Sequence, residues 1–431
     1  MKKKSARKIL KKIGKIILIV LAVIVGLLSI LGVIGCIVNP MVVENHLENI
    51  AKIEKVSYEN QLVPEKDADG NWTFTTDREL KILQLTDVHV GGGWLSKKQD
   101  TMAMNAVISM IKAEKPDLVF ITGDLVYPVP YESASFNNLP PHKMVANLME
   151  SLGVYWVPTF GNHDSEFYSN NTREEISDYY TNADLKYCLY QEGDENIFGC
   201  GNSVINVKNS QGIITQSLFA IDSNAYTGTG LIDVLSWAYD NIHEDQVEWY
   251  KMTVEKNTKY NNNLIASLDN KDELLEKYGK LNTLLFFHIP IAEYRDAWFE
   301  YVENDYKDTE NVKLIYGTAG EAGDVVYCGT EPDNLFETMQ ALGGKHGIFC
   351  GHDHVNNFSI EYQGIRLTYG LSIDYLAYSK IHTLGSQRGC TMITVNPDGS
   401  FDCVAENYYQ DKYAHEAREE VTMQVLNEDH K

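Results

Sequence analysis

Short apolar segments alternate with amphipathic ones along most of the chain, and several of them are hydrophobic at every position. Segments of this kind are typical of strands buried on both faces of a sheet. One of them, Leu118 to Ile121, follows a strand predicted at Lys81 to Leu85 and a helix predicted at Lys98 to Glu114. We expect these three elements to form a parallel, right-handed βαβ unit.

The same alternation continues further along the chain. It predicts helices at 142–152, 245–256 and 334–342, and strands at 154–160, 281–287 and 346–350. A hairpin is predicted over 203–221 and further hairpin strands over 358–404, so antiparallel strands join the parallel ones. Residues 291–330 are aromatic and acidic without clear periodicity, and we expect an inserted loop over the strand ends. The pattern therefore predicts an α/β fold.

The N-terminus has a different pattern. Residues 1–15 are strongly basic, and Ile16 to Val38 then continues for 23 residues without a charge. A helix of this length can cross the hydrocarbon core of a membrane, and the basic flank should stay in the cytoplasm. We therefore predict a single-pass signal-anchor at 16–38, with the rest of the chain outside the cytoplasm.

Two alternatives to the signal-anchor remain open. A buried core helix is disfavoured, because the segment is apolar all round and adjoins a block of charge. The sequence Val33 to Cys36 resembles the lipobox of bacterial lipoproteins, which would be cleaved before Cys36 and attached through a lipid. The signal-anchor and the lipoprotein both tether the chain to a membrane.

Composition excludes several classes of protein. The chain has 431 residues, of which 44% are hydrophobic and 23% are charged, so it can bury a large core. Its formal net charge is −23, and eight basic residues among the first 15 make the remainder more acidic still. Nucleic-acid binding depends on Lys and Arg that neutralise phosphates, so we expect no nucleic-acid partner.

Six cysteines follow Cys36, which permits disulfides outside the cytoplasm but does not define their pairing. The pairs that lie close in sequence are Cys188 with Cys200 and Cys390 with Cys403. The chain has no Cys-x-x-Cys spacing, so a thiolate zinc site is not indicated. Cys350 lies in an apolar strand, where we expect a buried free thiol.

Five of the predicted strands end in polar residues that are capable of binding metal ions. These are Asp87 with His89, Asp124, Asn162 with His163, His288, and His352 with His354. The carboxyl ends of parallel strands lie along one edge of a sheet, so residues far apart in the sequence can converge there. Imidazole nitrogens and carboxylate oxygens are donors for zinc, iron or manganese, and a carboxylate can bridge two ions.

Taken together and in order, these motifs resemble the motif set of the calcineurin-like metallophosphoesterases. The motifs are Asp87 to His89, Gly123-Asp124, Gly161 to Asp164, Phe287 to Pro290 and Gly351 to His354. Gly123 to Tyr127 and His288 to Pro290 resemble in particular the purple acid phosphatase-like branch. The resemblance implies a four-layer α/β/β/α sandwich of two mixed sheets, preceded here by one N-terminal transmembrane helix.

The resemblance covers residues 80–404 and gives the chain a domain order. Residues 39–79 are predicted to be a linker that ends in short strands, with a turn at 67–71. Residues 405–431 are predicted to be a polar tail with helical or frayed character.

The family pattern also implies a metal centre with two divalent or trivalent ions, of iron, zinc or manganese. The first ion would be held by Asp87, His89, Asp124 and His354, and the second by Asp124, Asn162, His288 and His352. Asp124 would bridge them. His163 would face the scissile ester and protonate the leaving oxygen, and Asp164 would orient its imidazole.

The activity implied by the resemblance is hydrolysis of phosphate monoesters by in-line attack of a metal-bound hydroxide. With the membrane tether, the protein would be an extracytoplasmic phosphatase acting on phosphate esters. A phosphodiesterase for nucleotides or lipid headgroups is one alternative. A catalytically silent surface-binding module on the same scaffold is another.

One position departs from the family pattern. Purple acid phosphatases use a tyrosine at the position of Tyr127 to bind ferric iron, and have no histidine where His89 stands. This chain has both residues. We favour His89 as the ligand, because an aromatic side chain at a strand end usually packs beside a site.

Overall fold

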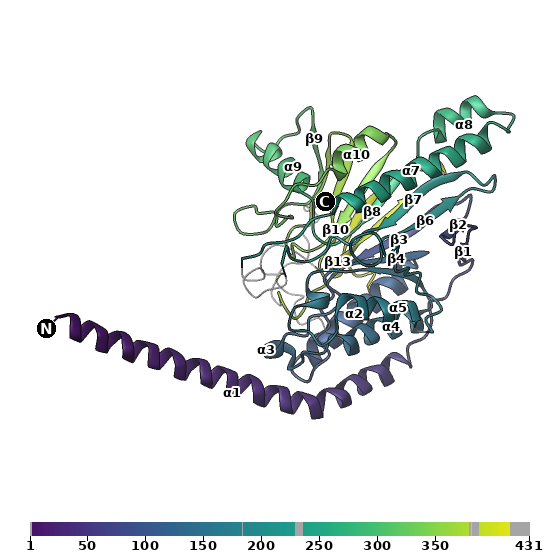
Figure 1. Ribbon diagram of the computed structural model, residues 1–431. Helices are drawn as coiled ribbons and strands as arrows, with labels where there is room; N and C mark the ends of the chain where they lie inside the picture. The colour runs from purple at the N-terminus through teal and green to yellow at the C-terminus, as the bar shows by residue number, and fades with distance from the viewer. Residues whose placement is uncertain (1, 183, 229–235, 379–380, 382–387, 414–431) are drawn as a thin grey trace.

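The protein is described by a computed structural model, which covers residues 2–182, 184–228, 236–378, 381 and 388–413 (Figure 1). Within these residues the strands form two sheets. The smaller sheet has the order β14 (Phe401–Asn407), β13 (Gly389–Val395), β3 (Leu80–Leu85), β4 (Leu118–Thr122) and β5 (Tyr155–Thr159). Its central strands β3, β4 and β5 are parallel, and β13 joins β3 in antiparallel orientation.

The larger sheet has nine strands in the described residues. In order they are β1 (Glu65–Lys66), β2 (Trp72–Thr75), β6 (Ser203–Lys208), β7 (Ile214–Ala220), β8 (Thr283–Phe286), β10 (His346–Cys350), β12 (Ile365–Tyr369), β11 (Ser359–Tyr362) and β9 (Val312–Tyr316). β7, β8, β10 and β12 are parallel, whereas β6 pairs with β7 as a hairpin. Both sheets are mixed, as the sequence predicts.

Helices cover the outer face of each sheet (Figure 1). On the smaller sheet these are α2 (Lys97–Glu114), α4 (Leu139–Leu152) and α5 (Arg173–Asn182). On the larger sheet they are α7 (Glu244–Ile265), α8 (Lys271–Tyr278), α9 (Ala292–Glu303) and α10 (Leu335–Leu342). The four-layer α/β/β/α sandwich is therefore confirmed, together with the parallel β3-α2-β4 unit.

The two sheets meet through aromatic side chains. Phe120 on β4 stacks on Phe286 on β8 with ring centroids 3.8 Å apart, and Phe286 lies 5.2 Å from Phe349 on β10. All three rings are completely buried. This contact holds the ends of the central strands of one sheet against those of the other, where the candidate ligands lie.

The expectation of an irregular loop at 291–330 is wrong for its first half. Residues 292–303 form α9, and β9 adds an edge strand to the larger sheet. Tyr294, Ala297 and Trp298 are buried at helical spacing. The charged residues Arg295 and Asp296 between them hid this short apolar stripe in the sequence pattern.

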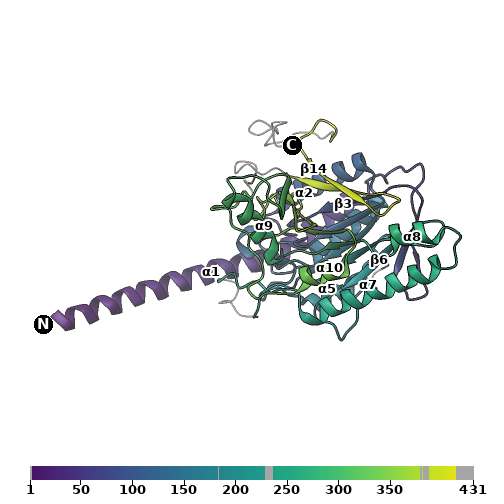
Figure 2. The ribbon, with the colours of Figure 1, turned by 90° about the horizontal axis from the view of Figure 1, so that it is seen from above.

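α1 (Lys2–Ile50) continues well beyond the predicted end of the apolar segment. From Lys8 it is the one helix among the described residues that is long and apolar enough to cross a membrane. Its apolar part projects from the domain, and its last turns lie along α4 (Figures 1 and 2). Val42, His46 and Ile50 are buried there, so the beginning of the predicted linker is a docked helix.

α1 changes direction between its projecting part and its docked part (Figure 1). Pro40 lies inside the helix, and a proline removes one backbone hydrogen bond and crowds the preceding turn. The bend therefore lies close to the end of the predicted membrane span.

The remaining local predictions have mixed outcomes. β1 and β2 flank the predicted turn at 67–71. All seven cysteines are free in the structure, so neither sequence-adjacent pair is bonded, and Cys350 is a buried thiol as predicted. β14 extends to Asn407, and the prediction for the tail beyond residue 413 falls outside the described residues.

We predict that Phe120→Ala destabilises the contact between the sheets. Loss of a fully buried phenylalanine leaves a cavity and should lower the free energy of unfolding by about 3–5 kcal/mol. Urea unfolding of the full chain in detergent measures the change. Phe299→Ala, at a ring that is 43% exposed on α9, should change it little. Equal effects of the two variants would contradict the assigned role of this contact.

Candidate metal centre

The carboxyl ends of strands from both sheets meet at one place. In the smaller sheet, β3 is followed by Asp87 and His89, β4 by Asp124, and β5 by Asn162 and His163. In the larger sheet, β8 is followed by His288, and β10 by His352 and His354. Asp87, His89, Asp124 and His354 each offer a donor atom, and these atoms lie within 4.8 Å of one another. Four residues from three widely separated parts of the sequence thus form one compact donor group.

Asp124 connects this group to a second set of side chains. Its Oδ2 atom lies 3.2 Å from Nε2 of His89 and 3.1 Å from Nε2 of His288. Nε2 of His288 is in turn 3.3 Å from Nδ1 of His352. A single carboxylate therefore lies between an imidazole of one sheet and an imidazole of the other.

Several buried oxygen atoms near Asp124 that could bind a metal ion have no hydrogen-bond partner among the described residues. They include Oδ2 of Asp87 and Oδ1 of Asn162, whereas Oδ1 of Asp87 lies 3.4 Å from Nε2 of His354. Asp87 and Asn162 are each 1% exposed, so water cannot satisfy them freely. Unpaired buried oxygens are costly, and a cation satisfies them. The donor set is therefore suited to metal ions on the chemistry of its own atoms.

The backbone at the candidate ligands is strained. Asp87 and His89 have φ 51°, Asp124 has φ 50° and His352 has φ 77°. Side chains other than glycine rarely occupy this left-handed region, although Asp and His tolerate it better than most. Strain of this kind persists where the surrounding structure imposes it and is concentrated at functional sites.

Three motif positions require glycine because neighbouring atoms approach their backbone closely. A Cβ atom at Gly161 would lie 2.2 Å from Oδ1 of Asp124, and one at Gly351 would lie 2.9 Å from Oδ2 of Asp87. A Cβ atom at Gly123, which has φ 78°, would lie 2.6 Å from the ring of His288. The glycines thus leave the space in which the candidate ligands stand.

Asp374, which the sequence analysis missed, contacts two of the candidate ligands. Its Oδ1 lies 3.3 Å from Nδ1 of His89, and its Oδ2 lies 3.1 Å from Nδ1 of His354. The backbone N–H groups of Leu376 and Ala377 donate to Oδ1 at 2.7 and 2.9 Å. Because Asp374 contacts Nδ1 of His89 and of His354, Nε2 of each ring faces the candidate metal centre.

The charges in the metal-free centre are paired. Burial lowers the pKa of His89, but Asp374 and Asp124 outweigh burial and raise it to about 10. Burial also opposes the charged form of His288, whose pKa Asp124 raises to about 9. Burial raises the pKa of Asp124, yet His288 and His163 hold it well below its usual range. A bound cation would take the place of the imidazole protons.

The structure places His163 beside the donor group but gives its ring a different partner from the one expected. Nδ1 of His163 lies 2.7 Å from Oε1 of Glu166. The Asp164 carboxylate accepts N–H bonds from Gly161, Asp124 and Val126. Asp164 therefore fixes the backbone around the centre, and the expectation that it orients the His163 ring is wrong. Glu166 lies only two residues further on, within the same turn.

Tyr127 packs beside the candidate ligands. Its ring centroid is 5.0 Å from that of His89 and 4.8 Å from that of His163. Burial, with Glu132 nearby, raises the pKa of the phenol, so it is protonated at neutral pH in the metal-free protein. The ring contacts with His89 and His163 are those expected of the packing role.

A pocket of about 260 Å³ opens over the centre. Asp124, His163, His352 and His354 form part of its wall. The aromatic part of the wall consists of Tyr127, Trp237, Tyr239, Tyr327 and Tyr378. A phosphate group can therefore reach the candidate ligands, with aromatic side chains around its substituent.

The profile of the family described as calcineurin-like phosphoesterase matches residues 80–356. The chain belongs to this family, which accounts for the ordered motifs and for the two mixed sheets. Its relatives are purple acid phosphatase-like proteins.

Two of these relatives come from Arabidopsis thaliana. The protein named "Probable inactive purple acid phosphatase 29" is 27% identical over 75% of this chain and 78% of its own. "Probable inactive purple acid phosphatase 14" is 28% identical over 72% and 74%. Among solved structures, a dimetal phosphatase from Danio rerio is similar over 77% of this chain and 97% of its own, with 10% identity and a TM-score of 0.45.

We predict that Gly161→Ala reduces metal binding without unfolding the protein. The new methyl group must displace the Asp124 carboxylate, whose Oδ1 would lie 2.2 Å away. Elemental analysis should show the loss of at least one ion per chain. Gly14→Ala is the control, because no atom lies within 4 Å of its Cβ position. Full metal content in Gly161→Ala would contradict the crowding argument.

We predict that Asp374→Asn weakens metal binding by about tenfold to a hundredfold, which is typical when a residue that orients a ligand is changed. An amide has one acceptor atom and cannot serve both imidazoles and the backbone N–H groups. Competition with a chelator measures the affinity. Asp402→Asn, on the exposed side of β14, should behave like the wild type. An unchanged affinity for Asp374→Asn would show that the two rings are fixed by packing alone.

Proposed function

We propose that the protein is a membrane-tethered, extracytoplasmic phosphoesterase that hydrolyses phosphate monoesters at a centre of two metal ions. The position of Asp124 carries this proposal. Its Oδ2 is within 3.2 Å of one imidazole from each sheet, and Oδ2 of Asp87 and Oδ1 of Asn162 are buried nearby without hydrogen-bond partners. Such an arrangement has little use in a merely structural site.

The donor atoms divide between two ions around Asp124. The first set is Asp87, His89, Asp124 and His354, and the second is Asp124, Asn162, His288 and His352. Bound ions of this kind polarise the phosphoryl oxygens and activate water for in-line displacement. The ligand chemistry is compatible with iron, zinc or manganese.

His163 is proposed as the acid that protonates the leaving oxygen. Its ring is 25% exposed and its Nδ1 lies against Glu166, which leaves Nε2 as the atom able to carry a proton into the pocket. Glu166 is held in turn by the hydroxyl of Tyr226 at 3.3 Å. Glu166 is therefore a positioning residue for His163, and Asp164 acts indirectly by holding the backbone of Asp124 and Gly161.

The membrane location is supported by two features of α1. Its apolar stretch is exposed to the surroundings, and the basic residues that precede it favour a cytoplasmic N-terminus. The catalytic domain then lies on the opposite side of the membrane. Lipid attachment at Cys36 is the alternative tether.

The competing proposal is a silent module, and the names of the Arabidopsis relatives give it weight, because both contain the word "inactive". In favour of catalysis, His163 keeps an acidic partner 2.7 Å away beside an open pocket. A binding module requires no such proton donor.

We predict that the full chain hydrolyses p-nitrophenyl phosphate faster than bis(p-nitrophenyl) phosphate when iron, zinc or manganese is supplied. Asp124→Asn should lose this activity together with at least one ion, because the shared carboxylate is lost. His163→Asn should keep its ions and lower kcat by about a hundredfold to ten-thousandfold, the usual contribution of general acid catalysis.

Phosphate release and elemental analysis on the same samples test these expectations. His243→Asn is the matched control, since His243 also pairs with an acid three residues away but does not line the pocket. Metal-loaded protein that is inert towards both esters would support the silent module. Full activity in Asp124→Asn would refute the two-ion centre.

A further inference from the structure

Asn39 joins the end of the predicted membrane span to two loops of the catalytic domain. It is the first residue after the apolar segment Ile16 to Val38. Its Oδ1 accepts the backbone N–H of Trp94 at 3.0 Å, and its Nδ2 donates to the carbonyl of Ala134 at 2.8 Å. One side chain therefore holds both loops to α1.

Both loops begin at candidate metal ligands. Trp94 is five residues after His89, and Ala134 follows Asp124 through Tyr127 and the short helix α3 (Pro130–Ser133). Five residues span at most about 18 Å when fully extended. Trp94 therefore lies within about 18 Å of His89, and one hydrogen bond of 3.0 Å and the Asn39 side chain complete the path from His89 to α1.

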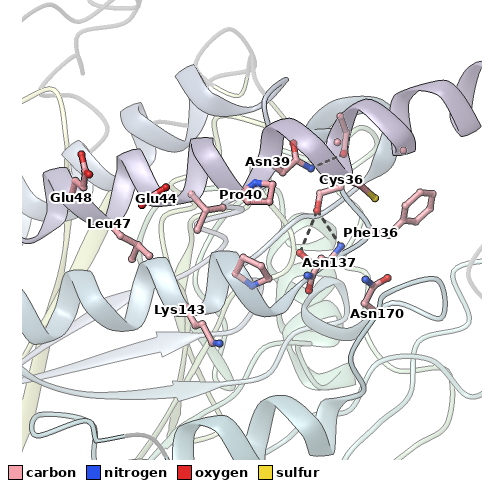
Figure 3. A pocket seen from close by; sticks show the side chains of 17 residues that line it. Cys36, Asn39, Pro40, Glu44, Leu47, Glu48, Phe136, Asn137, Lys143 and Asn170 are labelled. Carbon is pink, nitrogen blue, oxygen red and sulfur yellow. Dashed lines mark hydrogen bonds between the residues drawn. The ribbon is translucent and has the colours of Figure 1, made fainter.

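The loop at Ala134 also lies beside the last turns of the predicted span itself. A Cβ atom at Gly35 would be 2.3 Å from the carbonyl oxygen of Ala134, and one at Gly32 would be 3.9 Å from the ring of Phe136. Figure 3 shows Phe136 next to Cys36, at one end of a groove of about 890 Å³ between α1 and α4. Part of the catalytic domain is thus level with the end of the apolar segment.

Exposed aromatic side chains extend from this level toward the pocket. Tyr131 is 64% exposed, Phe136 is 37% exposed and Phe167 is 50% exposed. Tyr168 links the last two, because its ring lies 6.3 Å from Phe136 and 5.2 Å from Phe167. Aromatic side chains favour the boundary between water and lipid, so this face is suited to the membrane surface.

The direction of the strands in the larger sheet also relates the pocket to α1. In Figure 1 the β6–β7 hairpin turn lies beside α8, at the end of the domain away from the apolar part of α1. β7, β8 and β10 are parallel, so their carboxyl ends point toward the side on which that apolar part extends. The pocket at those strand ends thus faces the side where the membrane would lie.

The side chains that line the pocket also indicate which substituent the phosphate carries. Trp237 and Tyr378 are 59% and 43% exposed at its rim, and Glu321 and Asp353 contribute acidic groups. Aromatic rims favour an apolar substituent, whereas acidic groups oppose further negative charge on the substrate. A single phosphate on an apolar carrier is better suited to this wall than a nucleoside polyphosphate.

We propose that the substrate class is the phosphate monoesters of membrane lipids, taken from the bilayer in which α1 is anchored. This inference rests on the proposed phosphoesterase activity and names its substrate. The lipid stays in the membrane while its phosphate enters the pocket, and hydrolysis cleaves the P–O bond. Water adds to phosphorus, inorganic phosphate is released, and the lipid alcohol receives the proton.

The test compares substrates with the same phosphate group on different carriers. The full chain, loaded with metal in mixed micelles, is given dioleoyl phosphatidate, glycerol 3-phosphate or p-nitrophenyl phosphate. We expect a kcat/KM for phosphatidate at least about tenfold above that for glycerol 3-phosphate, since binding of the apolar carrier contributes to catalysis.

The double variant Phe136→Ala/Phe167→Ala tests the aromatic face. It should lower the phosphatidate rate by about tenfold through lost contact with the lipid phase and leave the p-nitrophenyl phosphate rate unchanged. Tyr260→Ala is the matched control, because this ring is 42% exposed on α7, near α8 and away from α1. It should change neither rate.

The outcomes separate this inference from the activity on which it rests. Hydrolysis of p-nitrophenyl phosphate without a preference for phosphatidate would overturn the lipid assignment and leave the phosphoesterase intact. An equal loss of both rates in the double variant would also overturn it. Inactivity on every ester would remove both proposals.

Discussion

The site depends on one buried carboxylate that is shared between two sheets. Oδ2 of Asp124 stands between His89 and His288, and its Oδ1 accepts the N–H of His163. An isolated buried charge would be strongly unfavourable, so these partners are a condition of the fold as well as of any chemistry. Other features of the structure around Asp124 serve the same site. Motif glycines clear the space, and strained backbone at Asp87 and His352 turns donor atoms inward.

The two sheets have different tasks in this arrangement. The smaller sheet delivers Asp124 and holds it through Asp164, which accepts three backbone N–H groups from adjoining loops. The larger sheet brings the imidazole of His288 from a strand end more than a hundred residues later in the chain. Stacking of Phe120 on Phe286 sets the distance between them. Sandwich packing is therefore what makes a joint site possible.

α1 adds a constraint that is unusual for a hydrolytic domain. A flexible linker would let the domain take many orientations, but the docked turns beyond Pro40 and the two bonds of Asn39 fix one orientation. Phe136, an exposed aromatic residue, lies beside Gly32 of the apolar segment. The docked turns therefore hold this part of the domain against the end of the apolar segment.

The sequence by itself determined most of the strands and helices, the apolar segment of α1 and the polar residues at five strand ends, because these are local patterns of hydrophobic period and residue type. It missed α9, whose apolar stripe is short. Only the tertiary structure decided that Glu166 rather than Asp164 contacts the His163 ring, that Asp374 lies against His89 and His354, and that Asn39 joins α1 to two ligand loops. The contacts of Asp374 and Asn39 join segments that are distant in the sequence, so no hydrophobic period or residue spacing predicts them. The contact of Glu166 is local, but which of two nearby acids faces the ring depends on the conformation of the turn.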